Sequence, residues 1–162
     1  MNADAFRQLY DYHFAENRNL WDWFIASMPQ EQFTQQHDYS LGSVRNQIVH
    51  LMSVDDAWFG DLLGIEIPSS PDPEDTLDRA VIRAYGDAVE QKVRGYLATL
   101  RDDMLFLKPF EAGEDKDLIL WQVLIHVVNH GTDHRAQLLR QLNDLGNKTP
   151  PQDFIFYVYD HP

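Results

Sequence analysis

Apolar side chains recur at steps of three and four residues along four long stretches, the spacing of one face of an α-helix. The stretches cover residues 3–28, 43–63, 76–100 and 118–145. Helices with one apolar face are stable when those faces pack against each other. The pattern therefore predicts an all-α protein, a four-helix bundle with a long middle crossover and a short C-terminal tail.

Residues that favour helix ends lie at the borders of these stretches. They are Pro29 after the first stretch, Ser43 before the second and Gly64 after it, Asp75 or Thr76 before the third, and Gly146 after the fourth. These positions predict where each helix begins and ends.

The connections have different characters. Residues 30–41 are polar and irregular, and residues 67–75 contain three prolines, so both predict loops. Residues 104–120 combine strand-like and turn-like segments, which favours a short hairpin or an extended crossover. The aromatic, β-branched tail at 153–162 is expected to pack on the bundle as an extended segment or a short helix.

The length of 162 residues is enough for one domain with a sizeable core, so we expect a single domain over residues 1–162. No run of eighteen apolar residues is present, which predicts no membrane-spanning helix. The first residues lack a basic region followed by an apolar one. We therefore expect no signal peptide and a cytoplasmic location.

Charge and cysteine content narrow the possible functions. A net charge of −13 repels phosphate backbones, which disfavours nucleic-acid binding. The chain has no cysteine, so disulfides, thiolate metal ligands and a cysteine nucleophile are excluded. Any sulfur nucleophile must arrive with a substrate.

Three histidines follow one another at four-residue steps in the fourth stretch: His126, His130 and His134. Four residues are about one helical turn, roughly 6 Å along the axis, so neighbouring rings lie on one face and can bind one divalent ion. All three cannot reach one ion, because the outer two lie about 12 Å apart. His50, in the middle of the second stretch, is the best candidate for a further ligand. The alternative is that these histidines are only surface or core residues.

Other polar and aromatic residues could surround such a site. Asn17 either is a buried amide with a backbone partner or faces the site, and Trp58 either walls a pocket or packs in the core. Asp55 and Asp56 are expected to be solvated or to support the ligands from behind. His13 is expected on the helix surface.

Common catalytic motifs are absent. The chain contains no G-x-S-x-G, P-loop or H-E-x-x-H pattern, and no Glu-x-x-His pattern of a di-iron bundle. A general base is not evident from the sequence, with Asp56 and His126 as weak candidates.

Two segments resemble the DinB/YfiT-like proteins: IVHLMSVDDAW at 48–58 and HVVNHGTDHRAQ at 126–137, together with Asn17 in AENRNL. The resemblance extends over essentially the whole chain. It implies a four-helix bundle in which His50, His130 and His134 hold one divalent metal ion, with His126 as an accompanying histidine. The chain departs from the family pattern at Asp133 and Ala136, which concerns the substrate pocket more than the metal.

The resemblance also implies a function. Related enzymes use a low-molecular-weight thiol, so we expect a metal-dependent enzyme that adds or transfers a thiol cosubstrate to a small electrophile. Zinc or nickel is the expected ion, with iron as a further option. A homodimer is implied as well. The alternative is a metal-binding or interaction module without catalysis.

Overall fold

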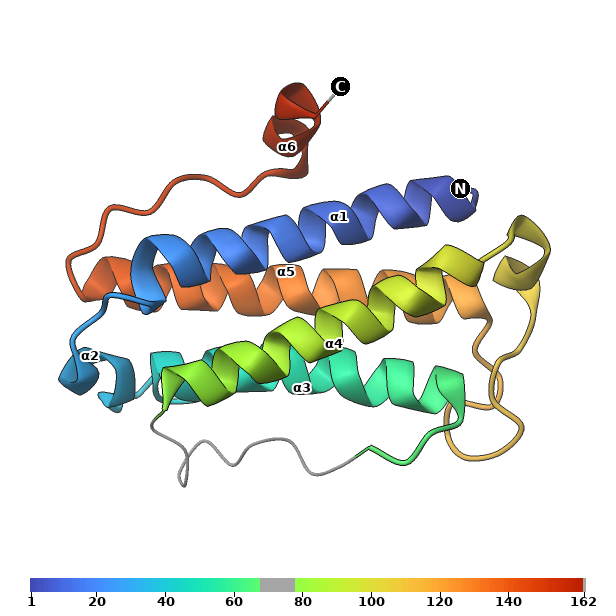
Figure 1. Ribbon diagram of the computed structural model, residues 1–162, viewed down its shortest axis with the longest axis horizontal. Helices are drawn as coiled ribbons and strands as arrows, with labels where there is room; N and C mark the ends of the chain where they lie inside the picture. Colours follow the sequence, from blue (N-terminus) through green and yellow to red (C-terminus); the bar gives the residue numbers. More distant parts are fainter. Residues whose placement is uncertain (68–77, 162) are drawn as a thin grey trace.

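Four long helices lie alongside one another in the structure, a computed structural model that describes residues 1–67 and 78–161 (Figure 1). They are α1 (Ala3–Leu20), α3 (Val44–Leu63), α4 (Arg79–Thr99) and α5 (Leu120–Asp144). No strand occurs among the described residues. The predicted all-α bundle is confirmed.

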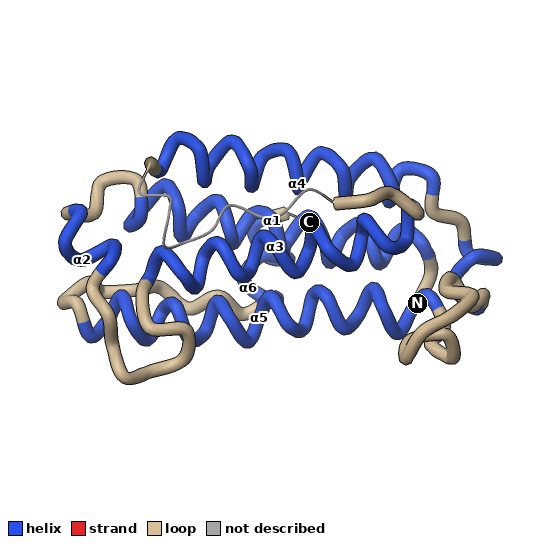
Figure 2. Tube along the Cα trace, turned by 90° about the horizontal axis from the view of Figure 1, so that it is seen from below, coloured by secondary structure: helices blue, strands red, loops and turns tan. Residues whose placement is uncertain are grey.

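The four helices form a ring in which each packs against two others. α3 contacts α4 and α5, and α1 contacts the same two helices. Figure 2 shows α3 lying between α4 and α5. The core is formed by two clusters of buried apolar residues, one around Phe6, Tyr10 and Phe59 and the other around Ile25, Phe33 and Ile48.

Several helix ends agree with the sequence pattern. The Ser43 side chain accepts a hydrogen bond from the Asn46 backbone and caps α3, which ends at Gly64 in the left-handed conformation with φ of 64°. Asp78 caps α4 through the Ala80 backbone. The predicted caps Asp75 and Thr76, and most of the proline-rich connection, lie outside the described residues.

The first helix does not stay α-helical to Met28 as predicted. It widens into a π-helical turn, η1 (Trp21–Ile25), in which the Ala26 N–H donates to the Trp21 carbonyl at 2.9 Å. Leu20, Trp21 and Ile25 are all buried in the same core cluster.

Two connecting segments also differ from the prediction. Residues 30–41 were expected to be loop, but Gln30–Thr34 form a short helix, α2, because Phe33 is buried in the core. Residues 104–120 form no hairpin. A 3-10 helix, η2 (Asp102–Phe106), leads into an irregular crossover, and α5 begins at Leu120 rather than at residue 118.

The tail forms a short helix, α6 (Phe154–Asp160), as one of the two predicted alternatives had it. It lies beside α1 on the outside of the bundle (Figure 1), where the Tyr12 ring contacts Phe154 and Tyr157. Within the described residues, no helix combines the length and the apolar character needed to cross a membrane.

Candidate metal site

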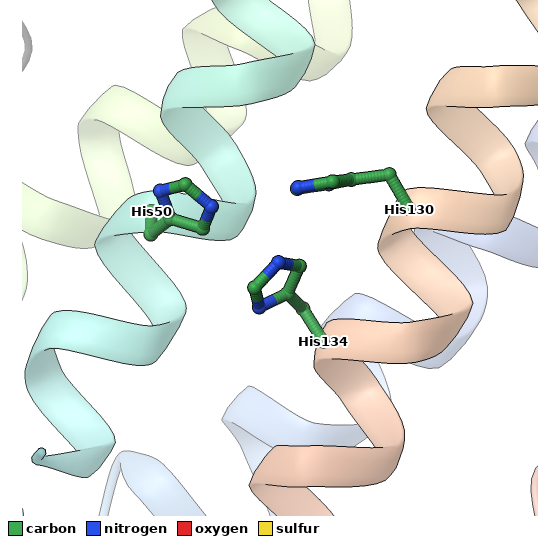
Figure 3. Close-up of side chains that lie close together, drawn as sticks. All are labelled: His50, His130 and His134. Carbon is green, nitrogen blue, oxygen red and sulfur yellow. The ribbon is translucent and has the colours of Figure 1, made fainter. Parts of the chain in front are cut away.

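Three histidine side chains meet between α3 and α5 (Figure 3). His50 comes from α3, and His130 and His134 come from successive turns of α5. One ligand atom from each ring lies within 4.8 Å of the others. The four-residue spacing on α5 and the packing of α5 on α3 thus produce one histidine cluster, close enough to bind a metal ion.

His126 is not part of this cluster, although it lies on the same face of α5. Its ring centroid is 6.0 Å from that of His130 and 5.1 Å from that of Trp58. His126 is exposed, and the indole of Trp58 lies edge-on to its ring. The structure therefore places His126 and Trp58 together, one turn away from the three clustered rings.

The surroundings keep the clustered imidazoles neutral. All three are half-buried, and burial is the main cause that lowers the pKa of His50, His130 and His134. The pKa of His130 falls to about 4, because its two neighbours also disfavour a second positive charge. Neutral rings offer the lone pairs that a divalent cation requires.

A buried amide, that of Gln47, lies against the Nδ1 side of the His134 ring. Gln47 Nε2 lies 2.8 Å from His134 Nδ1 and 3.0 Å from Gln137 Oε1, while Ser40 Oγ donates to Gln47 Oε1. Figure 3 shows that the other ring nitrogen of His134 faces His50 and His130. As placed, the Gln47 amide nitrogen also donates to the His134 backbone oxygen at 3.3 Å. Binding a cation through the other ring nitrogen leaves the proton on Nδ1, and the Gln47 amide must then turn over to present its oxygen.

One ring nitrogen of His130 lacks a hydrogen-bond partner. Its Nδ1 atom is buried and has no hydrogen-bond partner. A buried polar atom without a partner is costly unless something else satisfies it. The donor set of three neutral imidazoles, with no thiolate available in the chain, fits a divalent metal ion.

A buried polar layer links α1 to both α3 and α5. His13 is fully buried, not on the helix surface as expected, and its Nε2 lies 2.8 Å from Asp55 Oδ2. Asp55 is 2% exposed, so the expectation that it is solvated is wrong. Arg135 donates from Nη1 to His13 Nδ1 at 2.9 Å. The ring therefore carries its proton on Nε2 and bridges a guanidinium to a carboxylate.

Asn17 belongs to this layer. Its Oδ1 accepts from Arg135 Nη1 at 3.1 Å, and its Nδ2 lies 3.2 Å from His13 Nε2. Of the two alternatives for Asn17, neither fits fully, because its partners are side chains rather than backbone and they are not the clustered histidines. Asn17 fixes the buried layer that links α1 to α5.

Asp56 is also buried, again against expectation. It pairs with Lys92 and accepts a hydrogen bond from Tyr85, whose pKa is raised by burial and by this carboxylate. Both partners belong to α4, so Asp56 ties α3 to α4. With these contacts it faces away from the three histidines and gives no support to a role as general base.

Aromatic side chains lie in two places near the interior of the bundle. Phe14 and Trp21 line a cavity between α1, α3 and α4, together with Met52 and Asp55, and its lining contains none of the three histidines. Trp58 lies about one turn after Asp55 on α3, against His126 and Phe110. Only Trp58 stays a candidate wall for a substrate.

Comparison with known proteins shows the family of this chain. Residues 1–161 match the model of the DinB family. The chain belongs to the DinB family. It is 23% identical over 167 residues to Protein DinB of Bacillus subtilis (strain 168), an alignment that covers 98% of this chain and 96% of that protein. Membership of the DinB family thus extends over the whole bundle, including both helices that carry the histidines.

Within this DinB chain, sequence reasoning missed Gln47 and Arg135. Gln47 lies one turn before His50 on the same helix face, and that spacing was a usable signal. Arg135 follows His134 directly, but its partners His13 and Asn17 come from α1, more than a hundred residues earlier. The pairing of Arg135 with residues of α1 cannot be inferred from the sequence without the fold.

Proposed function

We propose that this DinB-family protein is a metal-dependent enzyme, a single domain whose ligands are His50, His130 and His134. The three half-buried imidazoles within 4.8 Å of one another support the proposal most directly. The low pKa of His130, which keeps its ring neutral, is further support. Zinc or nickel is the preferred ion, with iron as a further candidate.

The reaction we propose is the addition or transfer of a low-molecular-weight thiol to a small electrophile. An ion held by neutral ligands keeps its full charge and open positions, and can stabilise a cosubstrate thiol in its deprotonated form at neutral pH. The chain has no cysteine that could compete for the ion or act as the nucleophile. Trp58 and His126 lie beside the cluster and provide an apolar wall and an exposed proton acceptor.

The ligand assignment is tested by metal analysis of protein purified without chelators and then offered zinc or nickel. We expect one ion per chain in the native sequence and in His126→Ala, the matched control one turn away. His50→Ala, His130→Ala and His134→Ala should each lose it. Less than a tenth of an equivalent in the native protein, or equal loss in His126→Ala, contradicts the assignment.

The reaction is tested on cobalt-substituted protein titrated with small physiological thiols. A sulfur-to-cobalt charge-transfer band at millimolar thiol supports thiol binding at the ion. Its absence, in protein that retains cobalt, favours the alternative of a metal-binding module without thiol chemistry. We also propose a homodimer, as the family resemblance implies, and sedimentation at micromolar concentration distinguishes it from a monomer.

A further inference from the structure

A groove runs between α1 and α5 on the side of α5 that faces away from the histidine cluster. It encloses about 480 Å³, and residues 152–154, where α6 begins, border it. This volume lies within the usual range for small-molecule pockets, about 300–1,000 Å³. The walls are mainly apolar and are formed by Leu9, Tyr12, Ile125, Val128, Leu139 and Phe154.

Arg135 lines the same groove and is the only cation among its lining residues. It is 1% exposed, and a guanidinium keeps its charge in proteins. Its Nη2 donates to Thr132 Oγ1 at 3.0 Å, and the Tyr12 ring lies 5.3 Å from its central carbon. These partners, like His13 and Asn17, are all neutral.

The charge of Arg135 is thus left without a direct counter-charge. Among the described residues no carboxylate forms an ion pair with it: Asp55 reaches it only through the His13 ring, and Glu16 attracts it from beyond ion-pair distance. Its Nε atom is buried and has no hydrogen-bond partner. A buried cation usually has a paired anion, and a guanidinium presents two parallel N–H groups that match a carboxylate.

We propose that the α1–α5 groove binds a small amphipathic carboxylate. The carboxylate accepts from Arg135, whose Nε is free to donate, and the apolar part lies along Leu9, Val128 and Leu139. Thr132 stands at the polar end, where its hydroxyl already contacts the guanidinium. Asp153 is exposed at the rim, so its repulsion of an anion is screened by solvent and salt.

This site is separate from the proposed metal site, although both use α5. The helix presents His130 and His134 to α3, while Gly131 and Arg135 face α1. The proposal therefore holds whether or not the histidines bind a metal. A carboxylate could also bind a metal ion directly, and the experiment must exclude that explanation.

Octanoate is a suitable probe, with octanol as a control of equal chain length and no charge. Calorimetric titration of the full chain at low salt should show octanoate binding at least tenfold tighter than octanol. The difference should shrink as salt is added. His130→Ala, which weakens the metal site, should bind octanoate as the native protein does.

Two variants locate the binding. Ala136 is exposed and lines the groove, so Ala136→Trp should fill it and abolish octanoate binding, whereas Ala136→Ser should keep it. Arg135→Met should remove the preference for octanoate over octanol, provided that circular dichroism shows a folded protein.

Three results overturn the proposal. Equal affinity for octanoate and octanol means that the groove has no anion site. Octanoate binding that survives Ala136→Trp places the site elsewhere. No binding, in a protein that sediments as a dimer and becomes monomeric in Ala136→Trp, means that a second copy of the chain covers the groove.

Discussion

Gly131 lies on the face of α5 that packs against α1, next to the face that carries the clustered histidines. Its missing side chain lets the His13 ring lie directly against the helix, where an added Cβ would be 2.3 Å from His13 Cε1 and 2.6 Å from Nδ1. Neither the ring nor the Arg135 guanidinium can easily move, because both are buried and hydrogen-bonded. A glycine within a long helix is tolerated here because the contact requires it.

The first prediction is that Gly131→Ala lowers the free energy of unfolding by about 1–3 kcal/mol, the usual cost of an overpacked core. Urea denaturation measures it. Gly95→Ala in α4 is the matched control, since nothing lies within 4 Å of its added Cβ. There we expect a neutral change or a gain of up to about 1 kcal/mol from better helix propensity. Equal effects at both positions contradict the crowding argument.

The second prediction concerns Gln47, which orients His134. Gln47→Glu offers only acceptors to His134 Nδ1 and should maintain or raise zinc affinity. Gln47→Leu should lower that affinity about 10–100-fold, the usual effect of losing a group that orients a ligand. Competition with a chromophoric chelator provides the affinities. If Gln47 only packs between α3 and α5, the two variants will bind zinc equally.

Among the elements, α3 and α5 were predictable because their apolar faces repeat over many turns, and those faces also position His50, His130 and His134. The π-helical turn was not predictable from the sequence. It replaces hydrogen bonds between residues four apart with bonds between residues five apart, and this leaves the apolar pattern of Trp21–Ile25 unchanged. α2 was missed because Phe33 is its single buried residue. Short elements are determined by tertiary contacts that no local pattern contains.

Polar residues on apolar helix faces were the least predictable. His13, Asp55 and Asp56 were expected to face solvent, because isolated polar residues usually do. Each is buried with a partner from another helix. The partners are far away in the chain. Burial of each group therefore cannot be predicted without knowing its partner, and the partner is known only from the fold.

The third prediction tests the tie between α3 and α4. Asp56→Ala leaves Lys92 without its buried ion-pair partner and Tyr85 without an acceptor, so unfolding should cost about 1–3 kcal/mol less. Asp87→Ala, which breaks an exposed pair with Arg83, should change stability by less than about 1 kcal/mol. Metal content should stay unchanged in both. Loss of metal in Asp56→Ala alone would show that this carboxylate supports the ligands after all.

At the scale of the whole molecule, the lowered histidine pKa values connect stability to pH. Between the ordinary value of about 6.5 and the folded-state pKa of His130, about 4, the unfolded chain binds more protons than the folded one. The contribution of His130 to stability is therefore fully present above pH 6.5 and is lost as pH falls towards 4.

The fourth prediction follows. Metal-free protein should show a lower urea midpoint at pH 4.5 than at pH 7, and His130→Gln should lose less over that range, because the substituted side chain does not titrate. Carboxylates titrate in both proteins and cancel in the comparison. An identical loss in the two proteins contradicts a lowered pKa at His130.

The histidine cluster draws on two helices of the four. An ion bound there would secure α3 to α5 but would leave α1 and α4 without a direct link. Amide protons exchange with solvent through local openings as well as through global unfolding. Metal loading should therefore slow deuterium uptake most strongly in α3 and α5 near His50 and His130. In α1 and α4 it should slow only the amides that exchange by complete unfolding, so one half of the bundle would become more rigid than the other.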